Sequence, residues 1–390
     1  MSNTYLFTSE SVSDGHPDKL ADRISDTVLD RCLSLDPNAR VACETLLADN
    51  LVVVAGEFRL RSAEVFAQVR DELDGIVRGV LREAGYNAHF PGIDPGTCEV
   101  LLRVHGQSAQ IAGGVDRAPG VIGAGDQGLM FGYACDETPE LMPLPIQLAH
   151  QLMRRQQLLR RNGELPWLRP DAKAQVTVRY RDDRPLAVDA VVLSTQLQSD
   201  LSDAAIEREV IARLIEPVIP DELRGLEMRY LVNPAGRFED GGPHADTGLT
   251  GRKIVVDTYG GSCPHGGGAF SGKDPTKVDR SAAYAARWVA KHLVAAGLAR
   301  RATVQLAYAI GRPDPVSIRV DAHGTANVPE ARLEAIVPEV FDLTPAGIIR
   351  DLDLRRPVYA ATAAFGHFGR EEDGFTWERL DRVEQLRERV

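Results

Sequence analysis

Cysteine is scarce in this sequence, and long apolar runs are absent from it. The 390 residues include five cysteines, an odd number with no C-x-x-C spacing. We therefore expect reduced thiols rather than a disulfide framework or a zinc site. No apolar run approaches the ~20 residues that a membrane-spanning helix requires, and the N-terminus lacks the basic start and apolar stretch of a signal peptide. These absences predict a soluble, cytoplasmic protein with no membrane partner.

Basic residues are fewer than acidic residues in the sequence. The formal net charge is −11, whereas a surface that binds nucleic acid is broadly basic, so no nucleic-acid partner is expected. An anionic ligand would have to be held by a local group of cations. A chain of this length, 44% hydrophobic and 26% charged, has globular composition and is too long for one compact core, which predicts two or three domains.

Hydrophobic periodicity predicts strands and long helices in each third of the chain, a pattern typical of repeated α/β units. Strands are expected at 4–8, 51–56, 100–104, 176–180, 188–193, 303–310 and 316–320, and helices at 62–84, 145–161, 203–215 and 276–296. A further helix begins at Pro17, where the missing N–H of proline is not needed. Its apolar face carries Leu20, Ile24, Val28 and Cys32, and another face carries Asp18, Asp22, Asp26 and Asp30. For the last three aspartates we expect a solvated surface.

A region rich in glycine, proline and alanine extends from Asn87 to Asp126. Such a composition beside a predicted strand is typical of a mobile lid over an active site. A linker between two domains would have the same composition. The sequence leaves these two alternatives open.

The strongest chemical signal is the segment 265–280, His-Gly-Gly-Gly-Ala-Phe-Ser-Gly-Lys-Asp-Pro-Thr-Lys-Val-Asp-Arg. Glycines let the backbone approach an anion, and the start of the helix that follows favours negative charge. Lys273 and Lys277 are four residues apart and can reach one ligand, while Asp279 can coordinate a divalent cation. Residues 267–273 fit G-x-x-x-x-G-K, but a P-loop needs Ser or Thr next, where this chain has Asp274, and no apolar strand leads into the glycines. A polyphosphate-binding loop of another kind is predicted.

Three other segments add cations and carboxylates. Arg252 and Lys253 follow a glycine and precede a short apolar strand predicted at 254–256, and Asp171 and Lys173 follow a proline turn. Residues 15–20 faintly repeat the glycine, basic residue, proline and aspartate of residues 272–278. No Ser-His-Asp constellation, histidine cluster or activated cysteine is visible in the sequence. Such a site is expected to work by orienting substrates and stabilising departing charge.

Three long motifs resemble those of the S-adenosylmethionine synthetase family. Residues 7–19 (Phe-Thr-Ser-Glu-Ser-Val-Ser-Asp-Gly-His-Pro-Asp-Lys) resemble its N-terminal signature, residues 123–133 its hexapeptide motif (Gly-Ala-Gly-Asp-Gln-Gly), and residues 266–279 its glycine-rich motif. Further similarity at 165–173, 236–261 and 366–370 extends the match over nearly the whole chain in the family's order. Several long motifs in register make the resemblance highly specific.

The resemblance implies an α+β fold of three α/β domains with mixed sheets, related by pseudo-threefold repetition. The expected boundaries are 1–109 for the N-terminal domain, 123–240 for the central domain and 241–390 for the C-terminal domain. Residues 110–122 are expected to form a mobile loop or linker, with a lid at about 106–118. The family resemblance also implies a homotetramer, a dimer of dimers, in which two subunits share each active site.

The implied activity is that of a methionine adenosyltransferase. The sulfur of L-methionine attacks C5′ of ATP and displaces the whole triphosphate, which is then hydrolysed to pyrophosphate and phosphate. No covalent enzyme nucleophile is needed, which fits the missing triad. A leaving group of about four negative charges calls for many cations, and the family resemblance implies two Mg²⁺ per site and one K⁺ per subunit.

Carried over residue by residue, the resemblance implies four groups of site residues. Catalytic roles fall to His16, Lys173, Arg252 and Lys273. ATP is expected to contact His16, Asp171, Lys173, Arg237, Phe238, Asp246, Arg252, Lys253, Ala269 and Lys273, with Phe238 stacking on adenine. Methionine is expected to contact Glu57, Gln107, Asp126, Asp246 and Lys277. Magnesium is expected at Asp18 and Asp279, and potassium near Glu44.

The chain departs from the family's pattern at two places. The lid usually reads Gln-Ser-Pro-Asp-Ile, and here residues 107–111 read Gln-Ser-Ala-Gln-Ile. Losing that proline and aspartate is expected to alter how the lid closes. Ala245 stands where the family usually has glycine, a smaller change to the local backbone.

Two rival functions stay open from the residues alone. A P-loop-like nucleotide hydrolase would use residues 267–273 and release ADP without methionine. An inactive scaffold of the same fold would have lost some of the phosphate-binding lysines and metal-binding aspartates, yet Lys173, Lys273, Asp18 and Asp279 are all present.

Overall fold

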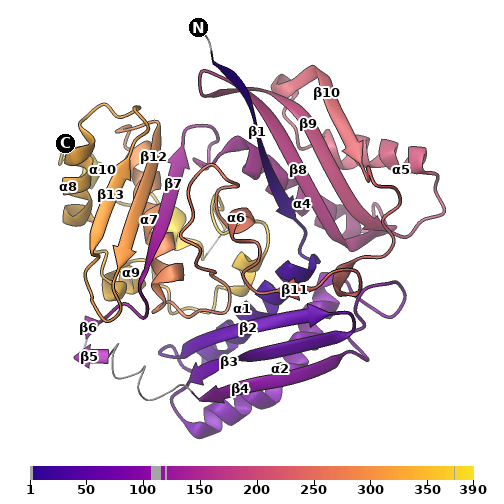
Figure 1. The fold of residues 1–390 in the computed structure, drawn as a ribbon, viewed down its shortest axis with the longest axis horizontal. Coiled ribbons are helices and arrows are strands. Elements are labelled where there is room, and N and C mark those ends of the chain that lie inside the picture. The colour runs from indigo at the N-terminus through magenta and orange to yellow at the C-terminus, as the bar shows by residue number, and fades with distance from the viewer. Residues whose placement is uncertain (1–2, 107–115, 119–120, 373) are drawn as a thin grey trace.

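Three β-sheets of three or four strands, packed against long helices, form most of the computed structural model, which describes residues 3–106, 116–118, 121–372 and 374–390. Three of these helices each pack on a different sheet. The helices are α1 (Pro17–Leu35), α4 (Leu144–Arg161) and α7 (Val278–Ala295). Their lengths are nearly equal, at 19, 18 and 18 residues. Figure 1 shows α1 near the centre of the molecule, where the three sheets approach one another. The predicted α+β fold is confirmed.

The first sheet joins strands from two distant parts of the chain. Its order is β11-β2-β3-β4, with β2 (Arg40–Ala48), β3 (Leu51–Arg59), β4 (Glu99–Gly106) and β11 (Gly248–Leu249). Strand β2 is antiparallel to β3 and β11, whereas β3 and β4 are parallel. Helix α1 packs on β2 and on α2 (Ala63–Ala84). Because β11 belongs to this sheet, the segment that follows it is held against α1.

The second sheet has the order β1-β8-β9-β10 and its own apolar core. Its strands are β1 (Thr4–Val12), β8 (Leu168–Arg181), β9 (Arg184–Leu197) and β10 (Arg224–Val232). Neighbouring strands are antiparallel except for β9 and β10, which are parallel. Helix α4 packs on β1 and β8. Helix α5 (Asp203–Val210) continues into a π-helical turn at Ile211–Ile215.

The third sheet has the order β13-β12-β7 and is antiparallel. Its strands are β7 (Gly128–Cys135), β12 (Arg301–Tyr308) and β13 (Ser317–Asp321). Helix α7 packs on β7 and β12, and its Tyr284 stacks on Trp377 with ring centroids 3.9 Å apart. The C-terminal helices are α8 (Glu330–Val340), α9 (Pro345–Asp351) and α10 (Val383–Arg387).

Three strands cross the domain boundaries that the sequence predicts. Strand β11, from the C-terminal part, pairs with β2 of the first 109 residues. Strand β1, from the first 109 residues, pairs with β8 of the central part. Strand β7, from the central part, pairs with β12 of the C-terminal part. The predicted boundaries stay a prediction, but these pairings show that each part contributes a strand to the sheet of another.

The remaining elements are short. They are β5 (Asp116–Ala118), β6 (Val121–Ile122), α6 (Ile254–Asp257) and turns of 3-10 helix at Asp221–Leu223, Gly242–His244, Ala360–Ala363 and Thr376–Glu378. Most of the predicted lid, including Gln107, Ala109 and Gln110, lies outside the described residues. In the described part of the chain, no helix has the length and apolarity needed to cross a bilayer.

Most elements predicted from periodicity are confirmed, with most ends displaced by a few residues. The largest displacement is that of β8, which begins at Leu168 rather than at residue 176. The strand expected at 254–256 is wrong, because these residues form α6, where the N–H of Asp257 donates to the carbonyl of Lys253 at 2.8 Å. Three apolar residues are too few for periodicity to separate a strand from a helical turn. Strand β2 was not predicted, and Thr45 on its buried face and Leu46 on its other face break the alternation of apolar and polar residues.

Candidate active site

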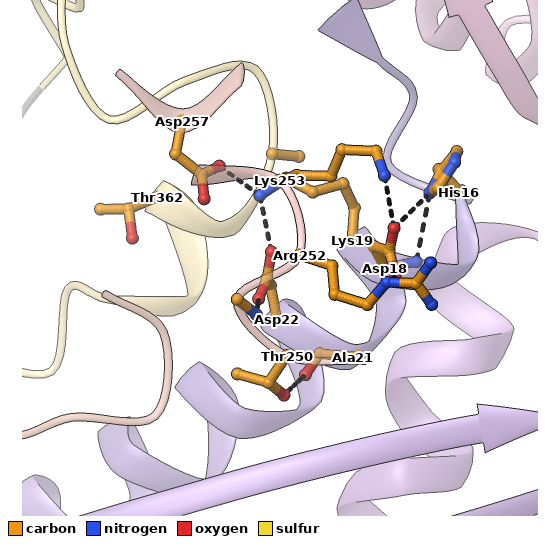
Figure 2. A network of polar contacts seen from close by, with 12 residues as sticks. His16, Asp18, Lys19, Ala21, Asp22, Thr250, Arg252, Lys253, Asp257 and Thr362 are labelled. Carbon is orange, nitrogen blue, oxygen red and sulfur yellow. Dashed lines mark hydrogen bonds and ion pairs between the residues drawn. The ribbon is translucent and has the colours of Figure 1, made fainter. Parts of the chain in front are cut away.

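The first turn of α1 gathers cations from a distant segment around one aspartate (Figure 2). His16 caps the helix, and its Nδ1 accepts the N–H of Asp18 at 3.1 Å. Lys253 Nζ lies 2.5 Å from Asp18 Oδ2, and Arg252 Nε lies 3.7 Å from Asp18 Oδ1. The N–H of Leu249 donates to Asp18 Oδ1 at 3.0 Å. The structure therefore brings together residues 16–18 and 249–253, as the sequence predicted for a single site.

The environment of His16 and Asp18 sets their charges. Burial, with Lys253 and Lys173 close by, lowers the pKa of His16 to about 3. The imidazole is therefore neutral, and because Nδ1 accepts a hydrogen bond, Nε2 carries the proton. Burial opposes ionisation of Asp18, but the hydrogen bonds from Lys253 and Leu249 outweigh it and lower the pKa of Asp18. His16 thus offers an uncharged N–H donor beside an ionised carboxylate.

The glycine-rich loop before α7 carries a second carboxylate and lysine pair. Lys273 Nζ lies 2.6 Å from Asp279 Oδ2, and both side chains are partly exposed. Lys277 instead pairs with the buried Asp274. Asp274 also accepts the hydroxyl of Thr276 at 2.6 Å and the N–H of Val41 at 2.7 Å. The residue that replaces the P-loop Ser or Thr therefore fixes the loop to β2 and holds Lys277.

Strand β8 carries a buried carboxylate, Asp171, that the described residues satisfy only in part. Asp171 Oδ2 accepts the N–H of Gly242 at 2.9 Å, whereas Oδ1 has no hydrogen-bond partner among the described residues. Burial raises the pKa of Asp171 to about 6. Lys173, two residues on, is exposed and pairs across the sheet with Val12, four residues before His16. A ligand that donates a hydrogen bond could satisfy Asp171 Oδ1.

The solvated surface expected for Asp22, Asp26 and Asp30 is wrong. Asp22 and Asp26 are fully buried. Asp22 Oδ1 accepts the N–H of Gly251 at 2.9 Å, and Asp26 Oδ1 accepts the N–H of Gly272 at 2.8 Å. Asp30 accepts two further N–H groups, from Tyr359 and Ala360. The acidic face of α1 is covered by segments more than 200 residues away, which local periodicity cannot detect.

Lys19 is a buried residue of the site to which the sequence analysis assigns no role. Its Nζ lies between Asp22, at 2.8 Å, and Asp257 of α6 (Figure 2). Burial raises the pKa of Asp257 to about 7, although Lys19 opposes this. A signal was present, because only six of the 45 basic residues are lysines, and four of the other five are assigned to phosphate binding or methionine. The six are Lys19, Lys173, Lys253, Lys273, Lys277 and Lys291.

Several predicted residues lie beside the glycine-rich loop. Ala42 of β2 bridges to Lys273 and pairs with Glu57 of β3, which places Glu57 one strand from the loop. A Cβ on Gly125 would lie 3.1 Å from the carbonyl oxygen of Thr276. Gly125 therefore contacts Thr276, and the next residues in the two segments are Asp126 and Lys277. A Cβ on Gly251 would meet that of Ala269 at 2.5 Å. The two glycine-rich segments are therefore in contact.

Other predicted residues have separate surroundings. Arg237 is exposed and pairs with Asp203 and Glu239, each at 2.9 Å. Phe238 is half-buried beside Gly241, on which a Cβ would lie 3.0 Å from the Phe238 ring. Asp246 and Glu44 are exposed, and Gln107 lies outside the described residues. The structure does not bring the side chains of Arg237, Phe238, Asp246 and Glu44 into the ion pairs described above around α1 and α7.

The donor set suits a divalent cation shared with a polyphosphate. Mg²⁺ is usually bound by one or two carboxylates together with phosphate oxygens rather than by an all-protein cage. Asp18 and Asp279 each supply one carboxylate, and each already neutralises a lysine. Among the described residues, no group of three or more His, Cys, Asp or Glu side chains could hold a metal. The residues present therefore fit magnesium only in company with a phosphate ligand.

Comparison with known proteins covers the whole chain. Three family models match it: "S-adenosylmethionine synthetase, N-terminal domain" at residues 4–109, "central domain" at 121–238 and "C-terminal domain" at 240–379. An S-adenosylmethionine synthase of a Nitratiruptor species is 57% identical over 386 residues, covering 99% of this chain and 98% of the relative. An S-adenosylmethionine synthase of a Sulfurovum species is 55% identical over 388 residues, covering 99% of both chains.

Proposed function

Because the chain belongs to the S-adenosylmethionine synthetase family and makes S-adenosylmethionine from L-methionine and ATP, we propose that the charged groups around α1 and the start of α7 carry out this reaction. The main support is the repeated pair of a carboxylate and a lysine, Asp18 with Lys253 and Asp279 with Lys273. Each carboxylate lies on the first turn of a long helix. Neither a P-loop-like hydrolase nor an inactive scaffold is favoured by the full-length relatives.

These pairs keep the charges of the site balanced when no substrate is present. Each lysine is neutralised by a proposed magnesium ligand. With ATP bound, the phosphate oxygens take over the lysines, and Asp18 and Asp279 become available to two magnesium ions. Magnesium supplies further positive charge at the phosphates. The protein therefore exchanges partners within a preorganised set of charges rather than building the site anew.

The proposed reaction is a direct displacement. The methionine sulfur forms a bond to C5′ of ATP, the bond from C5′ to the triphosphate oxygen breaks, and the triphosphate leaves with the electron pair. No proton has to move, because a thioether becomes a sulfonium without losing one. His16 Nε2–H donates to the departing oxygens, and Lys173, Arg252 and Lys273 neutralise the charge that develops. Hydrolysis of the triphosphate to pyrophosphate and phosphate follows.

The remaining proposed contacts hold the two substrates. Asp171 Oδ1, which lacks a partner among the described residues, would accept a hydrogen bond from the nucleotide, and Phe238 would stack on adenine. The other proposed ATP contacts are Arg237, Asp246, Lys253 and Ala269. The proposed methionine contacts are Glu57, Gln107, Asp126, Asp246 and Lys277, with K⁺ near Glu44. A homotetramer made of two dimers, with each active site shared between subunits in the cytoplasm, is part of the same proposal and rests on family membership.

Product analysis tests the reaction directly. Purified protein mixed with ATP, methionine, Mg²⁺ and K⁺ is expected to yield S-adenosylmethionine, pyrophosphate and phosphate by mass spectrometry and phosphate assays. Omitting methionine serves as the control for nucleotide hydrolysis. Formation of ADP with no sulfonium product would contradict the proposal in favour of the hydrolase.

His16 is expected to stay neutral throughout the neutral pH range in the free enzyme. Its pKa is lowered from 6.5 to about 3, first by burial and then by Lys253 and Lys173. The unfolded chain binds this proton below about pH 6.5, whereas the folded chain does not until far lower pH. Burial of His16 therefore lowers the folding stability as the pH falls from about 6.5 towards 3.

Nitrogen-15 NMR of the imidazoles can check the charge of His16, with His16→Asn to assign its signals. We expect the spectrum of a neutral ring protonated on Nε2 at every pH where the enzyme is stable. A titration of His16 with a midpoint near its ordinary value of 6.5 would contradict the proposed uncharged donor.

A further inference from the structure

We propose that Asp22 and Asp26 are positioning residues for this reaction, each fixing one glycine turn that presents the phosphate-binding cations. The inference rests on the proposed function of Arg252, Lys253 and Lys273. The 251 turn comprises residues 248–253, and the 272 turn comprises residues 266–273. Neither aspartate belongs to the groups proposed above to touch substrate or metal.

Asp22 holds the 251 turn by its backbone. Its Oδ1 accepts the N–H of Gly251 at 2.9 Å, and the next two residues are Arg252 and Lys253. Gly251 has φ +81°, a conformation that favours glycine. The hydrogen bond therefore orients the Thr250–Gly251 peptide, one residue before the two cations that face Asp18.

Asp26 holds the 272 turn in the same way. Its Oδ1 accepts the N–H of Gly272 at 2.8 Å, and the next residue is Lys273. Gly272 also has a positive φ, of +78°, and a Cβ there would collide with the carbonyl oxygen of Cys43. The turn is thus packed between β2 and α1, and Asp26 fixes the Ser271–Gly272 peptide, one residue before the lysine.

Each aspartate is neutralised by a buried cation. Lys19 Nζ lies 2.8 Å from Asp22 Oδ2. Arg280 forms two hydrogen bonds to Asp26, at 2.6 and 2.9 Å, and also donates to the carbonyls of Phe270 and Lys273 at 3.0 and 3.3 Å. Both Lys19 and Arg280 are fully buried. Buried carboxylates are tolerated only when they are paired and hydrogen-bonded. Here the ion pairs with Lys19 and Arg280 offset the cost of burying Asp22 and Asp26, and the two aspartates orient the turns of the site.

The spacing of the aspartates explains how one helix serves both turns. Asp18, Asp22, Asp26 and Asp30, four residues apart on α1, form an aspartate row along one face of the helix. The first three accept N–H groups from the 251 and 272 turns. Asp30 instead accepts N–H groups from Tyr359 and Ala360, at 2.9 and 2.8 Å, in a segment without a proposed site residue. The chain therefore contains its own matched control.

The test compares Asp22→Asn and Asp26→Asn with Asp30→Asn in the full-length enzyme. Each substitution removes one charge from the same helix face. We expect kcat to fall about tenfold to a hundredfold in the first two variants, the range that a small misplacement of catalytic groups produces. Hydrolysis of added inorganic triphosphate should fall with it, while the KM for methionine stays near the wild-type value. Asp30→Asn should leave both activities unchanged, whatever its thermal midpoint.

A second pair of variants covers the case in which an asparagine variant does not fold. Asp22→Glu and Asp26→Glu keep the charge beside Lys19 or Arg280 but move the carboxylate by one methylene, and the same selective loss of kcat is expected. The inference is overturned if the folded Asp22 and Asp26 variants turn over like Asp30→Asn, or if methionine KM and kcat change together. If Lys273→Ala keeps full activity, the proposed site itself is wrong. If Lys273→Ala loses activity but the Asp22 and Asp26 variants keep theirs, only the present inference is overturned.

Discussion

Replacing Lys273 with alanine is expected to lower kcat by about 10²–10³, the usual cost of removing one preorganised stabiliser of developing charge. The charge that leaves with the triphosphate must be neutralised during bond breaking, and a lysine in a held position does this without reorganisation. The backbone of Lys273 is held on both sides, because its N–H donates to Phe270 and its carbonyl accepts from Arg280. In the proposed reaction, only the ammonium group of Lys273 changes partner.

The ion pair with Asp279 gives this substitution a second effect. Without Lys273, Asp279 loses the partner that lies 2.6 Å away. The carboxylate is then less well compensated, so its affinity for magnesium in the presence of ATP is expected to rise while turnover falls. A loss of charge stabilisation without loss of metal binding distinguishes this variant from one that has simply lost the site.

Steady-state kinetics of S-adenosylmethionine formation measure the effect on kcat, and Mg²⁺ titration measures the effect on metal binding. Arg300→Ala is the matched control, because Arg300 is an exposed cation of the same protein outside the proposed site. It should leave kcat unchanged. Near-normal turnover of a folded Lys273→Ala enzyme would exclude Lys273 from the mechanism.

The parts of the structure that depend on local sequence were predictable. The spacing of four between Leu20, Ile24 and Val28 predicted α1, and all three side chains are buried on it. The helix after the glycine-rich segment was likewise predicted from glycine, lysine and proline that follow one another in the chain, and α7 begins at Val278; the phosphate-binding role of the segment stays a prediction. In both cases the residues that create the structure lie within a few positions of one another.

The errors concern partners that are distant in sequence. An aspartate on a helix is usually solvated, and nothing near Asp22 or Asp26 indicates that Gly251 and Gly272 will donate to them. Lys19 likewise meets Asp257 only after folding. The scarcity of lysine was the available signal. In a chain whose basic residues are nearly all arginine, a lysine marks a position that requires a compact ammonium group. Lys291 is the sixth lysine. It pairs with Glu378, whose replacement is expected to have the largest effect on stability.

Replacing Glu378 with alanine is expected to lower the free energy of unfolding by about 3–5 kcal/mol, the cost of leaving buried charge uncompensated. Glu378 is buried and pairs with Arg287 at 2.9 Å and Lys291 at 2.7 Å, two cations of α7 that are themselves buried. It also accepts the N–H of Gly369 at 2.8 Å. The carboxylate thus fastens the segment around Gly369 to the helix whose first turn carries Asp279.

The stabilisation by Glu378 should depend on pH in a defined direction. Burial opposes ionisation of this carboxyl, but Arg287 and Lys291 outweigh it and lower the pKa of Glu378 below its ordinary 4.5. Between the lowered folded value and 4.5 the unfolded chain binds more protons than the folded chain, so the contribution is complete above this window and is lost as the pH falls through it. The difference between wild type and Glu378→Ala should therefore be largest at neutral pH and shrink in acid.

Thermal and denaturant unfolding at several pH values can measure this difference. Glu384→Ala is the control, because Glu384 forms an exposed ion pair with Arg387 in the same C-terminal region, and such pairs contribute little. Equal midpoints for wild type and Glu378→Ala would show that Arg287 and Lys291 find other compensation within α7. A difference that grows in acid would mean instead that Glu378 is protonated in the folded enzyme, because the folded state would then gain rather than lose stability from the proton.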